Sequence, residues 1–148
     1  MVQASQGLLS MSILLVEDDE FARDLLEMIL TGAGLDVMAV SAGDEAIDLL
    51  EQGEVFDLLM TDIRLPGHYD GWSTAVEVRR FIPDIPVVYM TASHQQSCPV
   101  SRSVYLRKPV KPKLLISVIG ALLGRSLAVK PSVMQASPPV IGGASYIH

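Results

Sequence analysis

The chain has 148 residues, 49% of them hydrophobic and 19% charged, which predicts one globular domain with a substantial core. Its net charge of −6 argues against nucleic-acid binding, because phosphate backbones are bound by clustered lysines and arginines. The single cysteine, Cys98, excludes an internal disulfide and suits a reducing cytoplasm. The apolar stretch 7–16 is too short to span a membrane, and the first residues lack the basic region and cleavage site of a signal peptide.

Short apolar runs alternate with segments of helical periodicity along the chain. The runs are continuous rather than alternating, as is typical of strands that are buried on both faces of a parallel sheet. The repeated strand–helix alternation predicts right-handed crossovers and one five-stranded sheet with helices on both faces. The predicted strands are 13–16, 35–40, 56–61, 87–90 and 104–106. The predicted helices are 20–30, one that opens at Ser41 and includes Leu50, one that includes Trp72 and stops near Pro83, and 113–123.

Several residues outside the strand ends have a predicted local role. Ser41 and Asp44 have the spacing of a capping box at a helix start. Trp72 is expected to anchor the third helix in the core. The methionines are expected to fill the core, and the histidines, which have no metal-ligand spacing, are interpreted as surface residues. The residues concerned are Met28, Met38, Met60 and Met90, and His68, His94 and His148.

The connection between the fourth and fifth strands is unusually short. It runs from Thr91 to Ser103, and Pro99 interrupts it. Because proline disfavours a helix interior and restricts the residue before it, the fourth crossover helix is predicted to be short or missing. Residues 1–10 are expected to form an N-terminal extension, 11–124 the domain, and 125–148, rich in Ser, Pro, Val and Gly, a disordered tail.

Residues that carry chemistry follow four of the predicted strands. Glu17 and Asp18 follow the first strand, Asp62 the third, Thr91 the fourth and Lys108 the fifth. In open α/β sheets, ligands bind beyond the carboxyl ends of the strands, so these side chains should converge into one site. Three neighbouring carboxylates repel one another until a cation neutralises them, and Mg²⁺ prefers such oxygen ligands. The set therefore predicts a site for a divalent cation and a phosphoryl group.

The motifs at these strand ends resemble those of the response-regulator receiver domain of two-component signalling. They read LVEDD at 15–19, DLLMTDIRLPG at 57–67, YMTA at 89–92 and YLRKP at 105–109. The resemblance covers residues 11 to about 124. It implies an α/β, doubly wound five-stranded parallel sheet of the flavodoxin-like type, with strand order 2-1-3-4-5.

The same resemblance implies that Asp62 is the phosphoacceptor and that the cofactor is Mg²⁺. The donor would be a histidine kinase or a histidine phosphotransfer protein. Asp18 and Asp62 would bind the metal ion together with the backbone carbonyl of Arg64, and Glu17 would act through water. The domain would then be a stand-alone cytoplasmic signalling module without an output domain of its own.

Four further residues receive roles from the resemblance. Thr91 and Ala92 would lie at the phosphoryl group, and Lys108 would pair with it. Tyr105 occupies the position of the family's switch aromatic, which turns inward when the threonine moves toward the phosphoryl group. The signal would pass on by binding another protein, with no role for nucleic acid or membrane.

Two other interpretations stay open. A degenerate receiver that serves as a binding scaffold is mildly favoured by the short crossover. A Mg²⁺-dependent phosphohydrolase of the haloacid-dehalogenase type would also use a strand-end aspartate, but it needs a second aspartate two residues later, where this chain has Arg64. In a receiver, the Arg64 side chain could instead alter the lifetime of phosphorylated Asp62. The loop 66–71 is one residue longer than the commonest family form.

Overall fold

The computed structural model describes residues 10–92 and 99–129. Five parallel strands form one sheet in the order β2-β1-β3-β4-β5, so the predicted doubly wound fold is confirmed. None of the helices in these ranges is long and apolar enough to cross a membrane. The elements are β1 (Ser12–Val16), α2 (Glu20–Gly32), β2 (Asp36–Val40), α3 (Gly43–Glu51), β3 (Leu58–Asp62), α4 (Gly71–Phe81), β4 (Val87–Thr91), β5 (Ser103–Arg107) and α5 (Pro112–Leu123).

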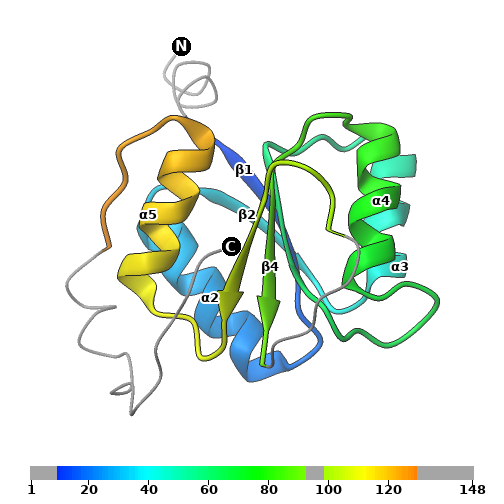
Figure 1. Ribbon diagram of the computed structural model, residues 1–148, viewed down its shortest axis with the longest axis horizontal. Coiled ribbons are helices and arrows are strands. Elements are labelled where there is room, and N and C mark those ends of the chain that lie inside the picture. Colours follow the sequence, from blue (N-terminus) through cyan, green and yellow to red (C-terminus); the bar gives the residue numbers. More distant parts are fainter. Residues whose placement is uncertain (1–9, 93–98, 130–148) are drawn as a thin grey trace.

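The sheet lies between two helical layers, with α2 and α5 on one face and α3 and α4 on the other (Figure 1). Successive strand residues point to opposite faces, so Leu14 packs in the core on the α3–α4 side and Leu15 in the core on the α2–α5 side. Both residues are fully buried. Burial on both faces is the physical reason why the strands read as continuous apolar runs rather than alternating ones.

The connection from β4 to β5 contains no helix in its described part, residues 92 and 99–102. Hydrogen bonds from neighbouring elements hold this segment. Arg79 of α4 donates from Nε to the Ile85 carbonyl at 2.7 Å and from Nη1 to Ser101 Oγ at 3.3 Å, and its Nη2 donates to the Ser101 carbonyl. The Val100 amide donates to the Tyr89 hydroxyl at 3.3 Å. The remaining part of the predicted short crossover, 93–98, lies outside the described residues.

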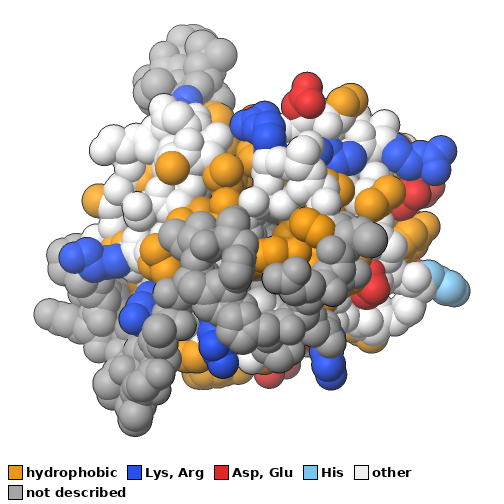
Figure 2. Space-filling model, viewed as in Figure 1, with side chains coloured by type: hydrophobic (Ala, Val, Ile, Leu, Met, Phe, Trp, Pro, Cys, Tyr) orange, Lys and Arg blue, Asp and Glu red, His pale blue; other side chains and the backbone are white. Residues whose placement is uncertain are grey.

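Three aromatic rings cover β4 and β5 on the α4 side. The ring centroids of Trp72 and Tyr89 are 4.7 Å apart, those of Trp72 and Tyr105 5.7 Å, and those of Tyr89 and Tyr105 5.5 Å. Trp72 also packs against the core on this side, which confirms its predicted anchoring role. On the face that shows edge strand β5, hydrophobic side chains gather at the centre (Figure 2). The aromatic cluster thus covers the sheet where a fourth crossover helix would otherwise lie.

The predicted capping box of Ser41 and Asp44 is wrong. Helix α3 begins at Gly43 with Ala42 as its N-cap residue, and no side chain caps it. Glu45 instead accepts hydrogen bonds from the Ser41 amide at 2.8 Å and the Ser41 hydroxyl at 2.7 Å. The longer glutamate side chain can reach back to Ser41, which leaves Asp44 to contact the loop after β3.

The methionines divide by element. Met60 and Met90 lie in central strands and are fully buried, as predicted. Met28 on α2 is 44% exposed and Met38 on β2 is 41% exposed, so their assignment to the core is wrong. Strand β2 is an edge strand, and Met28 lies outside the buried side of α2 that carries Ile29.

The chain continues along α5 beyond Gly124, which the sequence predicts to be the domain limit. The Arg125 amide donates to the Gly120 carbonyl at 2.8 Å, and Leu127 and Val129 pack against the core on the α2–α5 side. These residues, Ile116 and Lys113 line a groove of about 480 Å³. The rest of the predicted tail, 130–148, and residues 1–9 of the predicted extension lie outside the described residues.

Candidate functional site

Backbone pairing places the candidate residues at one edge of the sheet. Glu17 directly follows β1, and its amide donates to the Val40 carbonyl of β2 at 3.0 Å. Asp62 and Thr91 are the last residues of β3 and β4. The Lys108 amide donates to the Thr91 carbonyl at 2.7 Å, which extends the β4–β5 ladder by one residue. Parallel pairing therefore brings four separate sequence motifs to the same edge.

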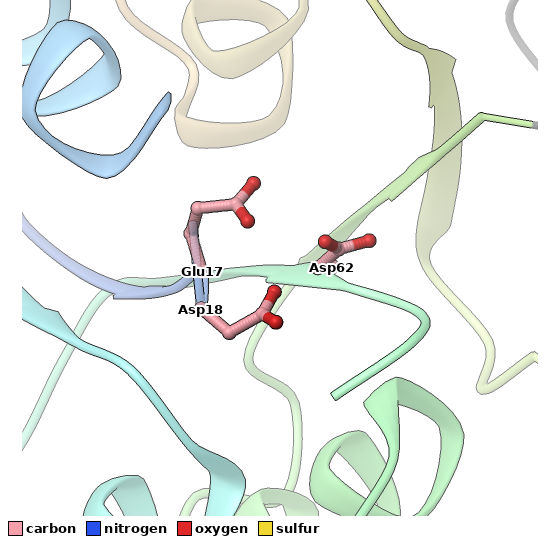
Figure 3. Close-up of side chains that lie close together, drawn as sticks. All are labelled: Glu17, Asp18 and Asp62. Atoms are coloured by element: carbon pink, nitrogen blue, oxygen red, sulfur yellow. The ribbon is translucent and has the colours of Figure 1, made fainter. Parts of the chain in front are cut away.

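Three carboxylates converge there. One oxygen each of Glu17, Asp18 and Asp62 lie within 4.8 Å of one another, and Figure 3 shows the three side chains gathered at the ends of their strands. Glu17 is fully buried, Asp62 is half-buried and Asp18 is exposed. Carboxylate oxygens are hard ligands of the kind that Mg²⁺ prefers, so the donor set fits a magnesium ion.

Lys108 bridges two of these carboxylates. Its Nζ donates to Glu17 Oε1 at 2.7 Å and to Asp62 Oδ2 at 2.8 Å. Burial raises the pKa of the Glu17 carboxyl, although the hydrogen bond from Lys108 acts in the opposite direction. Burial opposes the charge of Lys108, but hydrogen bonds to Asp62 and Glu17 outweigh it and raise the pKa of the ammonium group. The lysine is therefore held charged between the acids.

The three consecutive acids after β1 have different partners. Both oxygens of Glu17 are engaged, Oε1 with Lys108 and Oε2 with the Asp19 amide at 3.1 Å. Asp19 caps α2, since its Oδ1 accepts from the Ala22 amide at 2.9 Å. The Asp18 carboxylate makes no hydrogen bond within the described part of the chain. Asp18 is thus the acid of this trio that is open to an added cation.

The other predicted site residues lie around this cluster. Thr91 is 5% exposed at the end of β4, and Ala92 beside it is exposed. Arg64 follows Asp62 by two residues, and its side chain is exposed. Tyr105 is half-buried against Trp72, on the α4 side of the sheet. The structure therefore brings Glu17 and Asp62 into contact with Lys108 and places Asp18 beside them, whereas Tyr105 packs in the aromatic cluster.

Gly71 is a site residue that the sequence analysis missed. Its amide donates to the Ile63 carbonyl at 2.7 Å. A Cβ atom at this position would lie 2.3 Å from the Asp62 carbonyl oxygen and 2.6 Å from the Ile63 Cα. These are backbone atoms that cannot turn aside, so only glycine lets α4 begin this close to Asp62. The sequence signal was the Asp70–Gly71 pair, since Asp70 and Ser73 form the capping box of α4.

Hydrogen bonds join the loop between Asp62 and α4 to helix α3. Asp44 accepts from the His68 amide at 3.1 Å, and its other oxygen lies 2.7 Å from His68 Nδ1. This contact lowers the pKa of the Asp44 carboxyl. His68 is exposed, as predicted, but it also has an acidic partner that its sequence position does not reveal.

A doubly wound α/β sheet with an acidic cluster and a lysine at the carboxyl ends of its strands is the arrangement expected of a receiver domain. The chain belongs to the response regulator receiver domain family, whose sequence profile matches residues 13–120. Its place in two-component signalling, expected from the four motifs, is thereby confirmed.

Known proteins resemble the chain at the level of both sequence and fold. The transcriptional regulatory protein GltR of Pseudomonas aeruginosa is 36% identical over 122 residues, which cover 78% of this chain and 50% of that protein. The chain spans about half the length of GltR, and 18% of that of the transcriptional regulator NtrC of Klebsiella pneumoniae, which is 38% identical over 87 residues.

Solved receiver structures superpose on most of the chain. A response regulator receiver protein from Sinorhizobium medicae has a TM-score of 0.74 and 36% identity, over 79% of this chain and 97% of that one. The receiver domain of sensor histidine kinase PA1611 of Pseudomonas aeruginosa has a TM-score of 0.70 and 28% identity, over 78% of this chain and 98% of that one. The PA1611 structure contains a magnesium ion coordinated in its active site cleft.

Proposed function

We propose that the chain is an active phosphoacceptor and that Asp62 receives the phosphoryl group from a histidine kinase or a histidine phosphotransfer protein. The observation that carries this proposal is the position of Lys108, whose Nζ bridges Glu17 and Asp62 at 2.7 and 2.8 Å. A scaffold has no need of a charged lysine between two acids, because ion pairs of this kind cost desolvation energy and contribute little to stability.

The transfer follows from the chemistry of these groups. An Asp62 carboxylate oxygen attacks the phosphorus atom, the phosphorus–nitrogen bond of the phosphohistidine breaks, and the imidazole, whose other ring nitrogen carries a proton, leaves as a neutral base. The product is an acyl phosphate on Asp62. Phosphoryl transfer depends mainly on positioning and charge neutralisation, and Lys108 would supply a cation and Thr91 a hydroxyl to the phosphoryl oxygens. Ala92 is small and exposed and leaves the approach open.

Asp18 and Asp62, with the backbone carbonyl of Arg64, would hold Mg²⁺, and Glu17 would act through water. When bound, Mg²⁺ supplies positive charge that neutralises the phosphoryl oxygens. Two observations support direct binding of the metal ion by Asp18 and binding through water by Glu17. Both oxygens of Glu17 already accept hydrogen bonds, whereas Asp18 is exposed within 4.8 Å of the other two acids.

The signal would pass on by binding of another protein or by relay of the phosphoryl group. The single cysteine of the chain suits a cytoplasmic protein, and the net charge of −6 disfavours nucleic acid as a partner. Tyr105 would serve as the switch residue. Its ring packs against Trp72 and Tyr89, so its rotation would disturb the aromatic cluster that covers β4 and β5.

The test is the intact mass of the protein after incubation with acetyl phosphate and MgCl₂. A phosphoryl adduct should form on the wild-type chain and be absent from Asp62→Asn, and chelation of Mg²⁺ with EDTA should suppress it. Absence of the adduct from the wild type would favour the scaffold interpretation. Sustained turnover of p-nitrophenyl phosphate would favour the phosphohydrolase instead, which Arg64 at the position of the required second aspartate makes the weaker candidate.

A further inference from the structure

Arg23 lies beside the acidic cluster without belonging to it. It is a half-buried residue in the first turns of α2, and its Nη1 donates to the backbone carbonyl of Glu17 at 3.0 Å. Its own amide donates to the Asp19 carbonyl at 2.9 Å, within the helix that Asp19 caps. The guanidinium group therefore reaches back from the helix to the strand end that precedes it.

This contact completes the support of the Glu17 backbone. The Glu17 amide is fixed to Val40 of β2, and the Glu17 carbonyl is fixed by Arg23. The peptide unit between Glu17 and Asp18 is planar, so holding its carbonyl also fixes the position of the Asp18 Cα atom, from which the carboxylate side chain extends. Since the Asp18 carboxylate makes no hydrogen bond of its own in the described part of the chain, the backbone at this point is what places it at the site.

A second acid extends the support around the site. Glu45 of α3 accepts from the amide and hydroxyl of Ser41, the residue that follows Val40. These hydrogen bonds, and to a smaller extent the charge of Arg23, lower the pKa of Glu45. Arg23 is therefore close enough to Glu45 for their opposite charges to attract.

We infer that Arg23 is a positioning residue for the metal-binding carboxylate of Asp18, acting through the Glu17 carbonyl. This inference rests on the proposed magnesium site. It assigns Arg23 no contact with the metal ion or the phosphoryl group. Groups that orient metal ligands are worth about 10- to 100-fold in metal affinity, which sets the scale of the expected effect.

Positioning and charge predict opposite effects when Arg23 loses its guanidinium group. A positive charge near a cation site weakens cation binding, so if charge were its main influence, Arg23→Met would bind Mg²⁺ more tightly. If Arg23 positions the site, the same substitution leaves the Glu17 carbonyl without its donor and binding weakens. The sign of the change therefore separates the two roles.

The experiment measures the rise in unfolding temperature with MgCl₂ concentration, because a ligand at free concentration c that binds the folded state stabilises it by RT ln(1 + c/Kd), which yields its affinity. Each variant is compared with its own metal-free melting curve. Arg23→Met is expected to bind Mg²⁺ about 10-fold more weakly than the wild type. Arg23→Lys keeps an N–H donor and is expected to recover most of the affinity. Arg80→Met, at an exposed position on α4, is the matched control and should leave the affinity unchanged.

Unchanged or tighter binding by Arg23→Met would overturn the inference. Arg23→Lys decides the question even if Arg23→Met does not fold. If Arg23→Lys binds Mg²⁺ about 10-fold more weakly than the wild type, a hydrogen-bond donor at this position does not maintain the Mg²⁺ affinity, and the inference is wrong. The acetyl phosphate adduct on the wild type separates this inference from the proposed function. An adduct with no dependence of Mg²⁺ affinity on Arg23 removes only the inference. Arg23-dependent Mg²⁺ binding without an adduct removes only the phosphoacceptor role.

Discussion

Replacing Lys108 by Met should destabilise the protein in a way that depends on pH. The substitution removes the ammonium group that lies 2.7 Å from Glu17 and 2.8 Å from Asp62 and leaves the two acids facing each other. Glu17 is fully buried, and removal of one partner from a buried ion pair costs about 3–5 kcal/mol. Because the Lys108 side chain is 26% exposed, we expect the low end of this range, about 3 kcal/mol.

The pH dependence follows from the Glu17 carboxyl. Burial already raises its pKa above the ordinary value of 4.5, and loss of the Lys108 hydrogen bond and charge raises it further. A carboxyl whose pKa is higher in the folded state favours folding when protonated, and this contribution is lost as pH rises through the folded pKa. The penalty of Lys108→Met should therefore be full at about pH 7.5 and much smaller at about pH 5.

Urea unfolding in EDTA measures this penalty directly. At an m-value of about 2 kcal/mol/M, a loss of about 3 kcal/mol lowers the midpoint by about 1.5 M at neutral pH. Lys113→Met, an exposed substitution on α5, is the matched control and should change stability by less than about 0.5 kcal/mol. Addition of Glu17→Gln to Lys108→Met should restore much of the loss. A penalty that is equal at both pH values, or no greater than that of the control, would refute the reasoning.

Three further substitutions test other parts of the account. Gly71→Ala should cost about 2 kcal/mol in urea unfolding, since its Cβ would lie 2.3 Å from the Asp62 carbonyl oxygen; an unchanged midpoint would contradict this packing. Arg79→Met should cost about 1–2 kcal/mol through the lost hydrogen bonds to Ile85 and Ser101, a loss that Arg80→Met should not show. Asp18→Asn should weaken the Mg²⁺ affinity, measured from the MgCl₂-dependent rise in unfolding temperature, by at least about 10-fold, while metal-free stability stays within about 0.5 kcal/mol. An Mg²⁺ affinity equal to that of the wild type would remove Asp18 from the site.

The fold and the acidic cluster could be predicted because their signals are local in the sequence. Continuous apolar runs mark strands that are buried on both faces, and the polar residues that follow each run mark the edge where ligands bind. Glu17, Asp62 and Lys108 were found in this way, although they are far apart in the chain, because parallel pairing brings the strand ends together. The structure places Lys108 Nζ within hydrogen-bonding distance of both Glu17 and Asp62.

Contacts between one structural element and the next could not be predicted from the sequence. The reach of Arg23 to the Glu17 carbonyl and of Arg79 to Ser101 depends on how close neighbouring elements approach, and no periodic pattern records that distance. The closeness of Gly71 to the Asp62 carbonyl is of the same kind. The exposure of Met38 shows a second limit of the sequence pattern. An apolar residue on an edge strand fits the pattern of a buried strand even where its side chain is exposed.

The most direct test of the central claim is the position of the phosphoryl group. Borohydride reduces an acyl phosphate to an alcohol, so reduction of the phosphorylated protein, followed by proteolysis and peptide mass analysis, marks the residue that carried it. The account predicts one modified position, Asp62, with Glu17 and Asp18 unmodified. Modification at Asp18 or Glu17, or a wild-type adduct that persists in Asp62→Asn, would contradict it.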